Sequence, residues 1–110
     1  MLDNFKDGIQ LVIYINQSDL IDKKPAADRV ITSAMQYGFM GASLFRAVEG
    51  YGSSHVVERA HLLSLEDQRG EMIVLIDGES ARVEEFLNWL KGKLPGTFVT
   101  ASSIRHLRLS

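Results

Sequence analysis

The sequence predicts an α+β fold of the ferredoxin-like βαββαβ type, an antiparallel sheet with two helices on one face. Short, β-branched apolar runs indicate buried strands, and two segments repeat apolar residues at helical spacing. In chain order these elements read β-α-β-β-α-β. Right-handed crossovers from strand to helix to strand then place both helices on the same face of the sheet.

The first part of the chain contains a strand and a helix. Residues 11–15 (LVIYI) form a continuously apolar run that is typical of a central strand. A polar stretch follows, and Pro25 suits the first turn of a helix. Apolar side chains then recur at helical spacing as far as Gly38, which offers a C-terminal stop: Ala27, Val30, Ile31, Ala34 and Met35. We therefore predict a helix over about residues 25–37.

The middle of the chain predicts two antiparallel strands joined by a long loop. Residues 42–49 are the second strand and residues 71–77 (EMIVLID) the third, by their β-forming composition. Residues 56–65 (VVERAHLLSL) could extend either strand as a ribbon. Because residues 53–69 are more polar and irregular than their flanks, we expect an extended loop between the second and third strands.

The last part contains a helix and a strand. Residues 78–96 place Val83, Phe86, Leu87 and Leu90 on one face, with acidic residues in the first half and lysines at the end. This is an amphipathic helix. Residues 97–109 (TFVTASSIRHLRL) alternate after Pro95-Gly96 and predict the final strand. Trp89 is expected to pack rather than to bind a ligand.

Length and composition limit the range of functions. At 110 residues and 12.3 kDa the chain is expected to form one domain over residues 1–110. A net charge of −2 argues against general nucleic-acid binding. The chain has no cysteine, which fits a reducing compartment, and its apolar runs are too short to span a bilayer. Cytoplasmic localisation is the expectation.

The sheet is expected to be covered on both faces. Residues 11–15 and 72–76 are apolar at both odd and even positions, although the helices can cover only one face. A second apolar face of this size does not remain in water. The sequence thus predicts oligomerisation through the sheet.

Two glycines and several cations are candidate anion-binding residues. Gly50 and Gly52 flank Tyr51 at a strand end, where glycine backbone can approach a phosphate closely; they can equally be ordinary turn residues. Arg105 and Arg108 lie in the predicted last strand. Three positions apart, they should point to opposite faces, so one of them would serve any single site. The lysines before Pro25, Lys23 and Lys24, could contact phosphate or simply be solvated.

Other chemistries find less support. The three histidines, His55, His61 and His106, with Glu58, match no familiar metal-ligand spacing, so no metal site is predicted. The chain has no Gly-x-Ser-x-Gly elbow and no P-loop, and no catalytic residue is assigned. We therefore expect a protein that is not an enzyme.

With these elements in place, the chain resembles the PII-like superfamily, the relatives of the nitrogen-regulatory PII proteins, and in particular its branch of small uncharacterised domains. The segments that carry the resemblance are residues 11–15 with Asp19, 23–25 (KKP), 37–54 (YGFMGASLFRAVEGYGSS), 62–67 (LLSLED), 73–77 (IVLID) into 83–87 (VEEFL), and 98–109. The resemblance implies a homotrimer with inward-facing sheets and adenine nucleotides in clefts between subunits. It also implies a long loop that grips a membrane transporter or metabolic enzyme.

Individual positions carry over from this resemblance. Ser43 matches a hydroxyl residue near the adenine, Gly50 and Gly52 match glycines that line the cleft, and Arg105 approximates an arginine at the phosphates. Tyr51 and Ser53 belong to the same loop base, and Lys24 and Arg108 are additional phosphate candidates. The implied effector is ADP, AMP or ATP.

Four departures separate the chain from the nitrogen regulators. The second strand has one extra residue, which suggests a bulge. Ser53 and Ser54 replace an arginine and a glutamine that serve magnesium and 2-oxoglutarate. Residues 91–98 (KGKLPGTF) are shorter than the glycine-rich phosphate loop, and the second C-terminal arginine is displaced to Arg108. Binding of 2-oxoglutarate is therefore not expected.

The primary functional hypothesis is a non-catalytic, ligand-responsive signalling protein. The alternative is a trimeric divalent-metal-responsive protein of the cation-tolerance type, which metal titration would distinguish. An acylphosphatase-like enzyme ranks low because residues 16–19 (NQSD) supply no arginine. An RNA-recognition domain of the same topology ranks low because it would need aromatic residues on an open sheet and a basic surface, and neither is predicted here.

Overall fold

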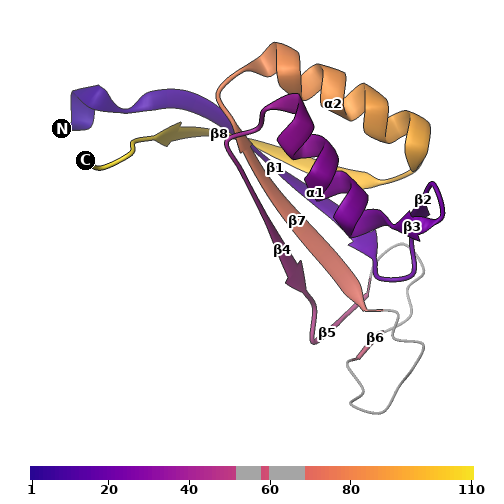
Figure 1. Cartoon of the computed structure of the whole chain (residues 1–110). Helices are drawn as coiled ribbons and strands as arrows, with labels where there is room; N and C mark the ends of the chain where they lie inside the picture. Colours follow the sequence, from indigo (N-terminus) through magenta and orange to yellow (C-terminus); the bar gives the residue numbers. More distant parts are fainter. Residues whose placement is uncertain (52–57, 60–68) are drawn as a thin grey trace.

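The computed structural model describes residues 1–51, 58–59 and 69–110. A 3₁₀ turn over Leu2–Asn4 is followed by two helices, a four-stranded sheet and two short hairpins (Figure 1). The elements in chain order are β1 (Lys6–Asn16), β2 (Leu20–Ile21), β3 (Lys24–Pro25), α1 (Ala26–Tyr37), β4 (Gly41–Arg46), β5 (Glu49–Gly50), β6 (Glu58–Arg59), β7 (Gly70–Asp77), α2 (Ser80–Lys93) and β8 (Phe98–His106).

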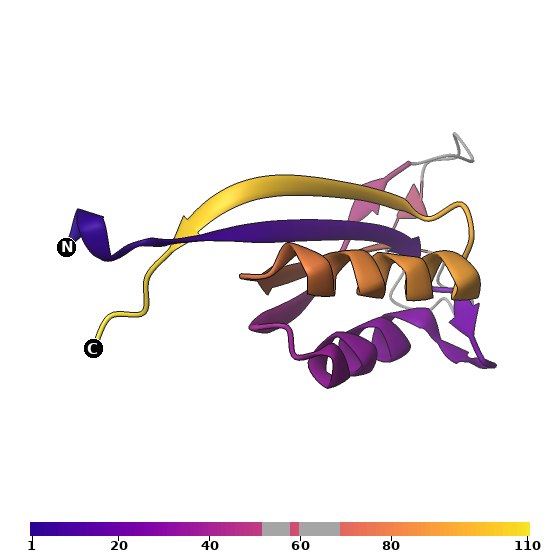
Figure 2. The same ribbon diagram turned by 90° about the horizontal axis from the view of Figure 1, so that it is seen from above.

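The main sheet has the strand order β4-β7-β1-β8, and each neighbouring pair is antiparallel. Seen from above, α1 and α2 lie together on one face of this sheet (Figure 2). This arrangement confirms the predicted ferredoxin-like sandwich. It follows from the alternation along β7, where every second residue is buried against the helices.

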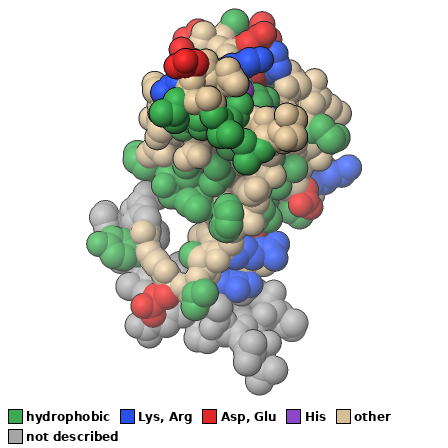
Figure 3. Space-filling model, turned by 90° about the vertical axis from the view of Figure 1, so that its left-hand side faces the viewer, with side chains coloured by type: hydrophobic (Ala, Val, Ile, Leu, Met, Phe, Trp, Pro, Cys, Tyr) green, Lys and Arg blue, Asp and Glu red, His purple; other side chains and the backbone are tan. Residues whose placement is uncertain are grey.

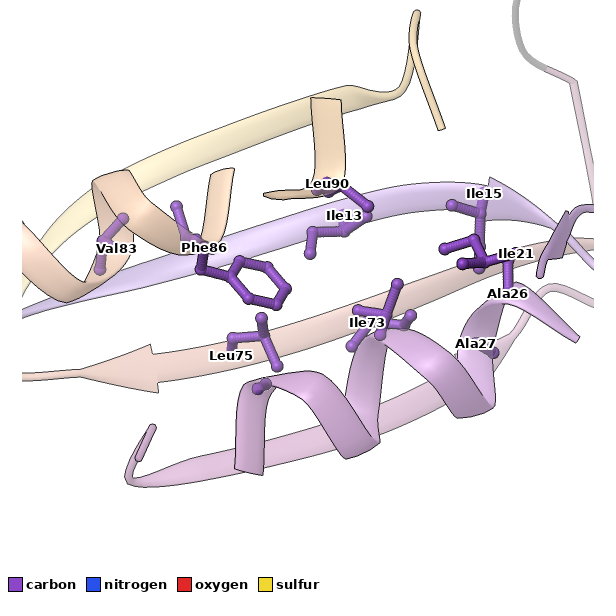
Figure 4. Close-up of a cluster of buried hydrophobic side chains, with 13 residues drawn as sticks. Ile13, Ile15, Ile21, Ala26, Ala27, Ile73, Leu75, Val83, Phe86 and Leu90 are labelled. Carbon is purple, nitrogen blue, oxygen red and sulfur yellow. The ribbon is translucent and has the colours of Figure 1, made fainter. Parts of the chain in front are cut away.

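The core lies between the helices and the central strands. Ile13 of β1, Ile73 of β7 and Phe86 of α2 are fully buried in it (Figure 4). The rings of Tyr37 and Phe39, just at and after the end of α1, lie 5.8 and 5.1 Å from that of Phe86. Trp89 packs 5.6 Å from the same ring, as expected for a packing residue.

Gly38 ends α1 as the sequence predicted. It adopts a left-handed conformation with φ 92°, and its N–H donates to the carbonyls of Ala34 and Met35. Phe39 N–H also donates to Ala34 O at 3.0 Å. These bonds satisfy carbonyls that the helix leaves open, and glycine allows them without steric cost.

Three local predictions needed correction. β1 runs from Lys6 to Asn16 and so extends well beyond the predicted residues 11–15. Leu20–Ile21 and Lys24–Pro25 form a hairpin that was not predicted. The second strand ends at Arg46, before the predicted residue 49, and Glu49–Gly50 pair separately as β5. The strand ends are polar, and periodicity gave no signal there.

The sheet face opposite the helices carries exposed apolar side chains. The strand registers place Val12 and Tyr14 of β1 beside Val74 and Met72 of β7, and Tyr14 also beside Phe98 of β8. The Tyr14 and Phe98 rings lie 5.7 Å apart, and both are exposed. The predicted second apolar face is therefore present in the chain.

β1 and β8 continue past the rest of the sheet as a two-stranded arm. β7 ends at Asp77 opposite Ile9, so Lys6 to Gly8 pair with β8 alone. Figures 1 and 2 show this arm projecting beyond the helices and carrying both ends of the chain. The arm lies at the opposite end of the sheet from β5 and β6.

Candidate functional site

The candidate site lies at the end of the sheet where β1 and β4 finish and β7 begins. Ala47 N–H donates to Gly70 O, and Gln17 N–H donates to Arg69 O, both at 2.9 Å. β5 and β6 then pair through Glu49 with Arg59 and Gly50 with Glu58. We call this region the loop end of the sheet. The predicted loop itself lies mostly outside the described residues.

Gly50 and Tyr51 are placed at this loop end, as the sequence analysis expected. Gly50 pairs in β5, and its backbone does not lie in the left-handed region. A Cβ atom built on Gly50 would meet no heavy atom within 4 Å, so the packing of the described residues does not itself require glycine there. Tyr51 is exposed. Gly52 and Ser53 lie outside the described residues.

An ion pair at the loop end was missed by the sequence analysis. Arg46, the last residue of β4, lies directly opposite Glu71 of β7. Its Nε donates to Glu71 Oε2 at 2.8 Å. The Glu71 side chain is only 4% exposed, whereas that of Arg46 is 51% exposed. The available sequence signal was Glu71, an acidic residue near the start of an otherwise apolar strand. That Arg46 is its partner could be recognised only from the strand register.

Ser43 and Lys24 occupy separate surfaces. Ser43 is exposed on β4, where it pairs with Val74. Residues of β4 alternate between faces, which places Ser43 on the open face and Arg46 on the helix side. Lys24 is exposed in β3. The structure does not place these two side chains in one described contact.

Arg105 lies in the arm, far from Gly50. Its register partner is Asp7 of β1, nine residues before the Asn16 end, a separation of about 30 Å along a strand. There Arg105 Nη2 donates to Leu2 O at 3.0 Å, and its guanidinium carbon lies 5.4 Å from the centre of the Phe5 ring. A single chain thus does not bring Arg105 and the loop end together.

The expectation for Arg108 was partly wrong. β8 ends at His106, so Arg108 lies beyond the strand and is exposed. The argument that Arg105 and Arg108 alternate across one strand therefore does not apply. A strand of the predicted length would have needed pairing past the start of β1, and β1 begins opposite His106.

The structure also bears on the metal and membrane alternatives. Within residues 1–51, 58–59 and 69–110, no group of three His, Cys, Asp or Glu side chains is arranged to hold a metal ion. His106 lies against Gly8, where a Cβ would approach its ring to 2.9 Å. His55 and His61 lie outside the described residues. None of the described helices is both long and apolar enough to cross a membrane.

Comparison with known proteins identifies the family. Residues 8–106 match the family model DUF190, described as "Uncharacterized ACR, COG1993". The chain is also 29% identical over 86 residues to the UPF0166 protein of Aquifex aeolicus (strain VF5), covering 78% of this chain and 81% of that protein. Since the match extends over nearly the whole sequence, the chain belongs to the DUF190 family.

Solved structures assign the fold to the PII-like class. CPII, a nitrogen regulatory PII-like protein from Thiomonas intermedia K12 bound to ADP, AMP and bicarbonate, superimposes with a TM-score of 0.63 at 19% identity. The comparison covers 94% of this chain and 92% of CPII. A candidate PII-like signaling protein from Thermus thermophilus gives a TM-score of 0.61 at 14% identity, over 94% and 90% of the two chains. The fold that the resemblance implied is therefore confirmed.

Proposed function

We propose that this protein is a non-catalytic PII-like signalling protein that binds an adenine nucleotide and regulates a partner. The observation that carries this proposal is the shared fold with CPII, which has been solved with ADP, AMP and bicarbonate. ADP, AMP or ATP is the effector, bound near Ser43, Gly50, Tyr51, Gly52, Ser53 and Arg105. Lys24 and Arg108 are further phosphate contacts, and a membrane transporter or metabolic enzyme is the target.

The open space at Gly50 supports a ligand at the loop end. Glycine there leaves the backbone accessible, and the described residues around it do not fill the space that a side chain would occupy. Backbone N–H groups in such a position can bind phosphate. Ligand binding would then select one arrangement of residues 51–70, to the extent of its differential affinity for the alternatives.

The separation of Arg105 from Gly50 supports a cleft between copies. Arg105 pairs with Asp7 near one end of β1, and Gly50 lies in β5 at the other end of the sheet, a separation of about 30 Å along the strand that no side chain spans. If both contact one nucleotide, Arg105 must come from a neighbouring copy. A cyclic homotrimer supplies such clefts and covers the open apolar face of each sheet.

Titration calorimetry with ADP, AMP and ATP tests nucleotide binding, and zinc and copper titrations test the metal-responsive alternative. Arg105→Ala removes a charge-assisted contact and is expected to weaken nucleotide affinity about ten- to a hundredfold. Gly50→Val should fold normally, since its side chain enters open space, and should also weaken affinity.

Mixing subunits of the two variants tests the shared cleft. A cleft formed by the intact arm of one copy and the intact loop end of another should bind normally. Exchange by dilution and reassociation should therefore restore a tight-binding fraction that neither variant shows alone. A mixture with no such fraction would contradict the assignment of Arg105 and Gly50 to one inter-subunit site.

A further inference from the structure

Buried acidic residues occupy both ends of the row of β7 side chains that faces the helices, and each of them pairs with an arginine. Glu71 stands at the loop end and pairs with Arg46. Asp77 stands at the other end, 2% exposed in its side chain, and pairs with Arg82 of α2 at 3.3 Å. Between them the same row holds Ile73 and Leu75, both fully buried. Both pairs join a buried acidic residue of β7 to an arginine, but the two arginines differ in how many of their guanidinium nitrogens have a partner.

Arg82 has a partner for every guanidinium nitrogen. Its Nε lies 3.3 Å from Asp77, Nη1 donates to Gly38 O at 2.8 Å, and Nη2 donates to Glu79 at 2.7 Å. Its side chain is only 26% exposed. Arg82 therefore connects α2 with the end of α1 and the end of β7, and this full set of bonds is what a structural arginine requires.

Arg46 has a partner for one nitrogen. Nε is held by Glu71, and among the described side chains of residues 1–51 and 69–110 no hydrogen-bond partner is present for Nη1 or Nη2. Half of the side chain is exposed. Figure 3, which views the left-hand side of Figure 1, shows a group of Lys and Arg side chains on this side of the molecule. Arg46 lies four residues before Gly50, at the same end of the sheet.

Stability alone gives little reason for this pair. Removing a carboxylate from water is costly, and a buried ion pair is commonly no more stable than an apolar pair of the same size. A buried carboxylate that holds Nε does, however, fix the plane of the guanidinium. The two terminal nitrogens are then presented together, in the fork geometry that binds two oxygens of one anion.

We propose that Arg46 binds an oxyanion at the loop end of the sheet and that buried Glu71 positions its guanidinium. The ligand class is an oxyanion that offers two oxygens side by side, either a nucleotide phosphate or a small free anion such as hydrogencarbonate. This proposal rests on the proposed function, since it adds an anion contact to the same site. Arg46 contacts the ligand, and Glu71 acts through Arg46.

The test compares four ligands on the full chain by titration calorimetry: AMP, adenosine, hydrogencarbonate and inorganic phosphate. Because Arg46→Gln alone leaves a buried unpaired carboxylate, the main variant is the double substitution Arg46→Gln with Glu71→Gln. Arg46→Lys keeps the positive charge but lacks the pair of terminal guanidinium nitrogens. Glu71→Gln alone removes the carboxylate that holds the guanidinium in position. Arg82→Lys is the matched control from the second pair.

The double variant is expected to lose about ten- to a hundredfold in AMP affinity and nothing in adenosine affinity. Arg46→Lys and Glu71→Gln should show smaller losses that are again confined to the anionic ligands. Arg82→Lys should lower the unfolding temperature without changing AMP affinity. The Nε–H resonance of Arg46 should move on addition of AMP but not of adenosine, which a purely structural ion pair would not do.

The two proposals can fail separately. Equal AMP affinity in the wild type and the double variant, or equal losses for AMP and adenosine, would overturn the role of Arg46 while leaving nucleotide binding in place. Hydrogencarbonate or phosphate binding that the double variant loses, with no nucleotide binding by the wild type, would refute the nucleotide proposal and support the Arg46 site. A wild type that binds none of the four ligands overturns both.

Discussion

At the residue scale, the junction of α1, β7 and α2 depends on one carboxylate and one glycine. Asp77 Oδ1 accepts the N–H groups of Gly78 and Glu79 at 2.6 and 3.2 Å, just before α2 begins. Arg82 lies beside the same carboxylate and reaches across to Gly38 O. Two backbone amides thus donate to one oxygen of a buried acid, and a guanidinium forms an ion pair with the other, at the point where three elements meet.

Gly38→Ala is expected to destabilise the fold by about 1–2 kcal/mol. Gly38 has φ 92°, and a Cβ there would lie 3.1 Å from Arg82 Nη1, so the substitution strains the backbone and disturbs a bound guanidinium. Urea unfolding measures the change.

Gly92→Ala is the matched control for this substitution. Gly92 lies within α2, and a Cβ there would meet no heavy atom within 4 Å. Alanine is the better helix former, so this variant should gain about 0.5 kcal/mol. A loss of the same size in both variants would show that the conformation of Gly38 is not the cause.

At the element scale, the turn of the hairpin formed by β2 and β3 is attached to both helices through one acidic residue. Its two-residue turn, Asp22 and Lys23, has positive φ at both positions, 52° and 66°. Asp22 lies 3.3 Å from Arg29 of α1 and 3.2 Å from Lys93 of α2. This turn matches the twist of the paired strands but is unfavourable for a lysine, whose Cβ disfavours the left-handed region.

Lys23→Gly is therefore expected to stabilise the protein by about 0.5–1 kcal/mol, because glycine adopts this turn conformation freely. Lys24→Gly should instead destabilise it, since Lys24 lies in β3 with no positive φ and pairs with Ile21. Thermal unfolding of both variants gives the comparison. A gain from Lys24→Gly, or a loss from Lys23→Gly, would contradict the strain assigned to the turn.

At the scale of the whole molecule, the two faces of the sheet differ in how far they are buried. One face is buried under α1 and α2, and the other exposes aromatic and aliphatic side chains of β1, β4, β7 and β8. An exposed cluster of apolar side chains of this kind is normally covered by another chain. The proposed homotrimer covers it with copies of itself.

Sedimentation equilibrium of the wild type should give a mass near three times 12.3 kDa. Phe98→Glu places a charge on the open face, where the Phe98 side chain is 66% exposed in one chain, and should dissociate the assembly. Met35→Glu is the control, because Met35 is 71% exposed on α1, away from that face. A wild-type monomer at micromolar concentration, or equal dissociation by both variants, would contradict association through the sheet.

Hydrophobic periodicity and turn residues were sufficient to predict the order of the helices and strands along the chain and their approximate centres. Both helices, the helix stop at Gly38 and the four strands of the main sheet follow from hydrophobic periodicity and turn residues, which act over a few positions. The ends of β1 and the hairpin of β2 and β3 were not predictable in this way. The ends of β1 are mostly polar and pair only where a partner strand is present, and the hairpin depends on a turn without the usual Asn-Gly signal.

For the candidate site, the sequence alone determined which residue types are present and that Gly50 and Tyr51 follow the second strand. The tertiary structure decided which of them lie together. Register pairs Arg46 with a buried Glu71, and the antiparallel course of β8 puts Arg105 at the far end of the sheet from Gly50. The physical reason is that strand pairing joins residues far apart in the chain, so the partner of a charged side chain is set by the sheet and not by its sequence neighbours.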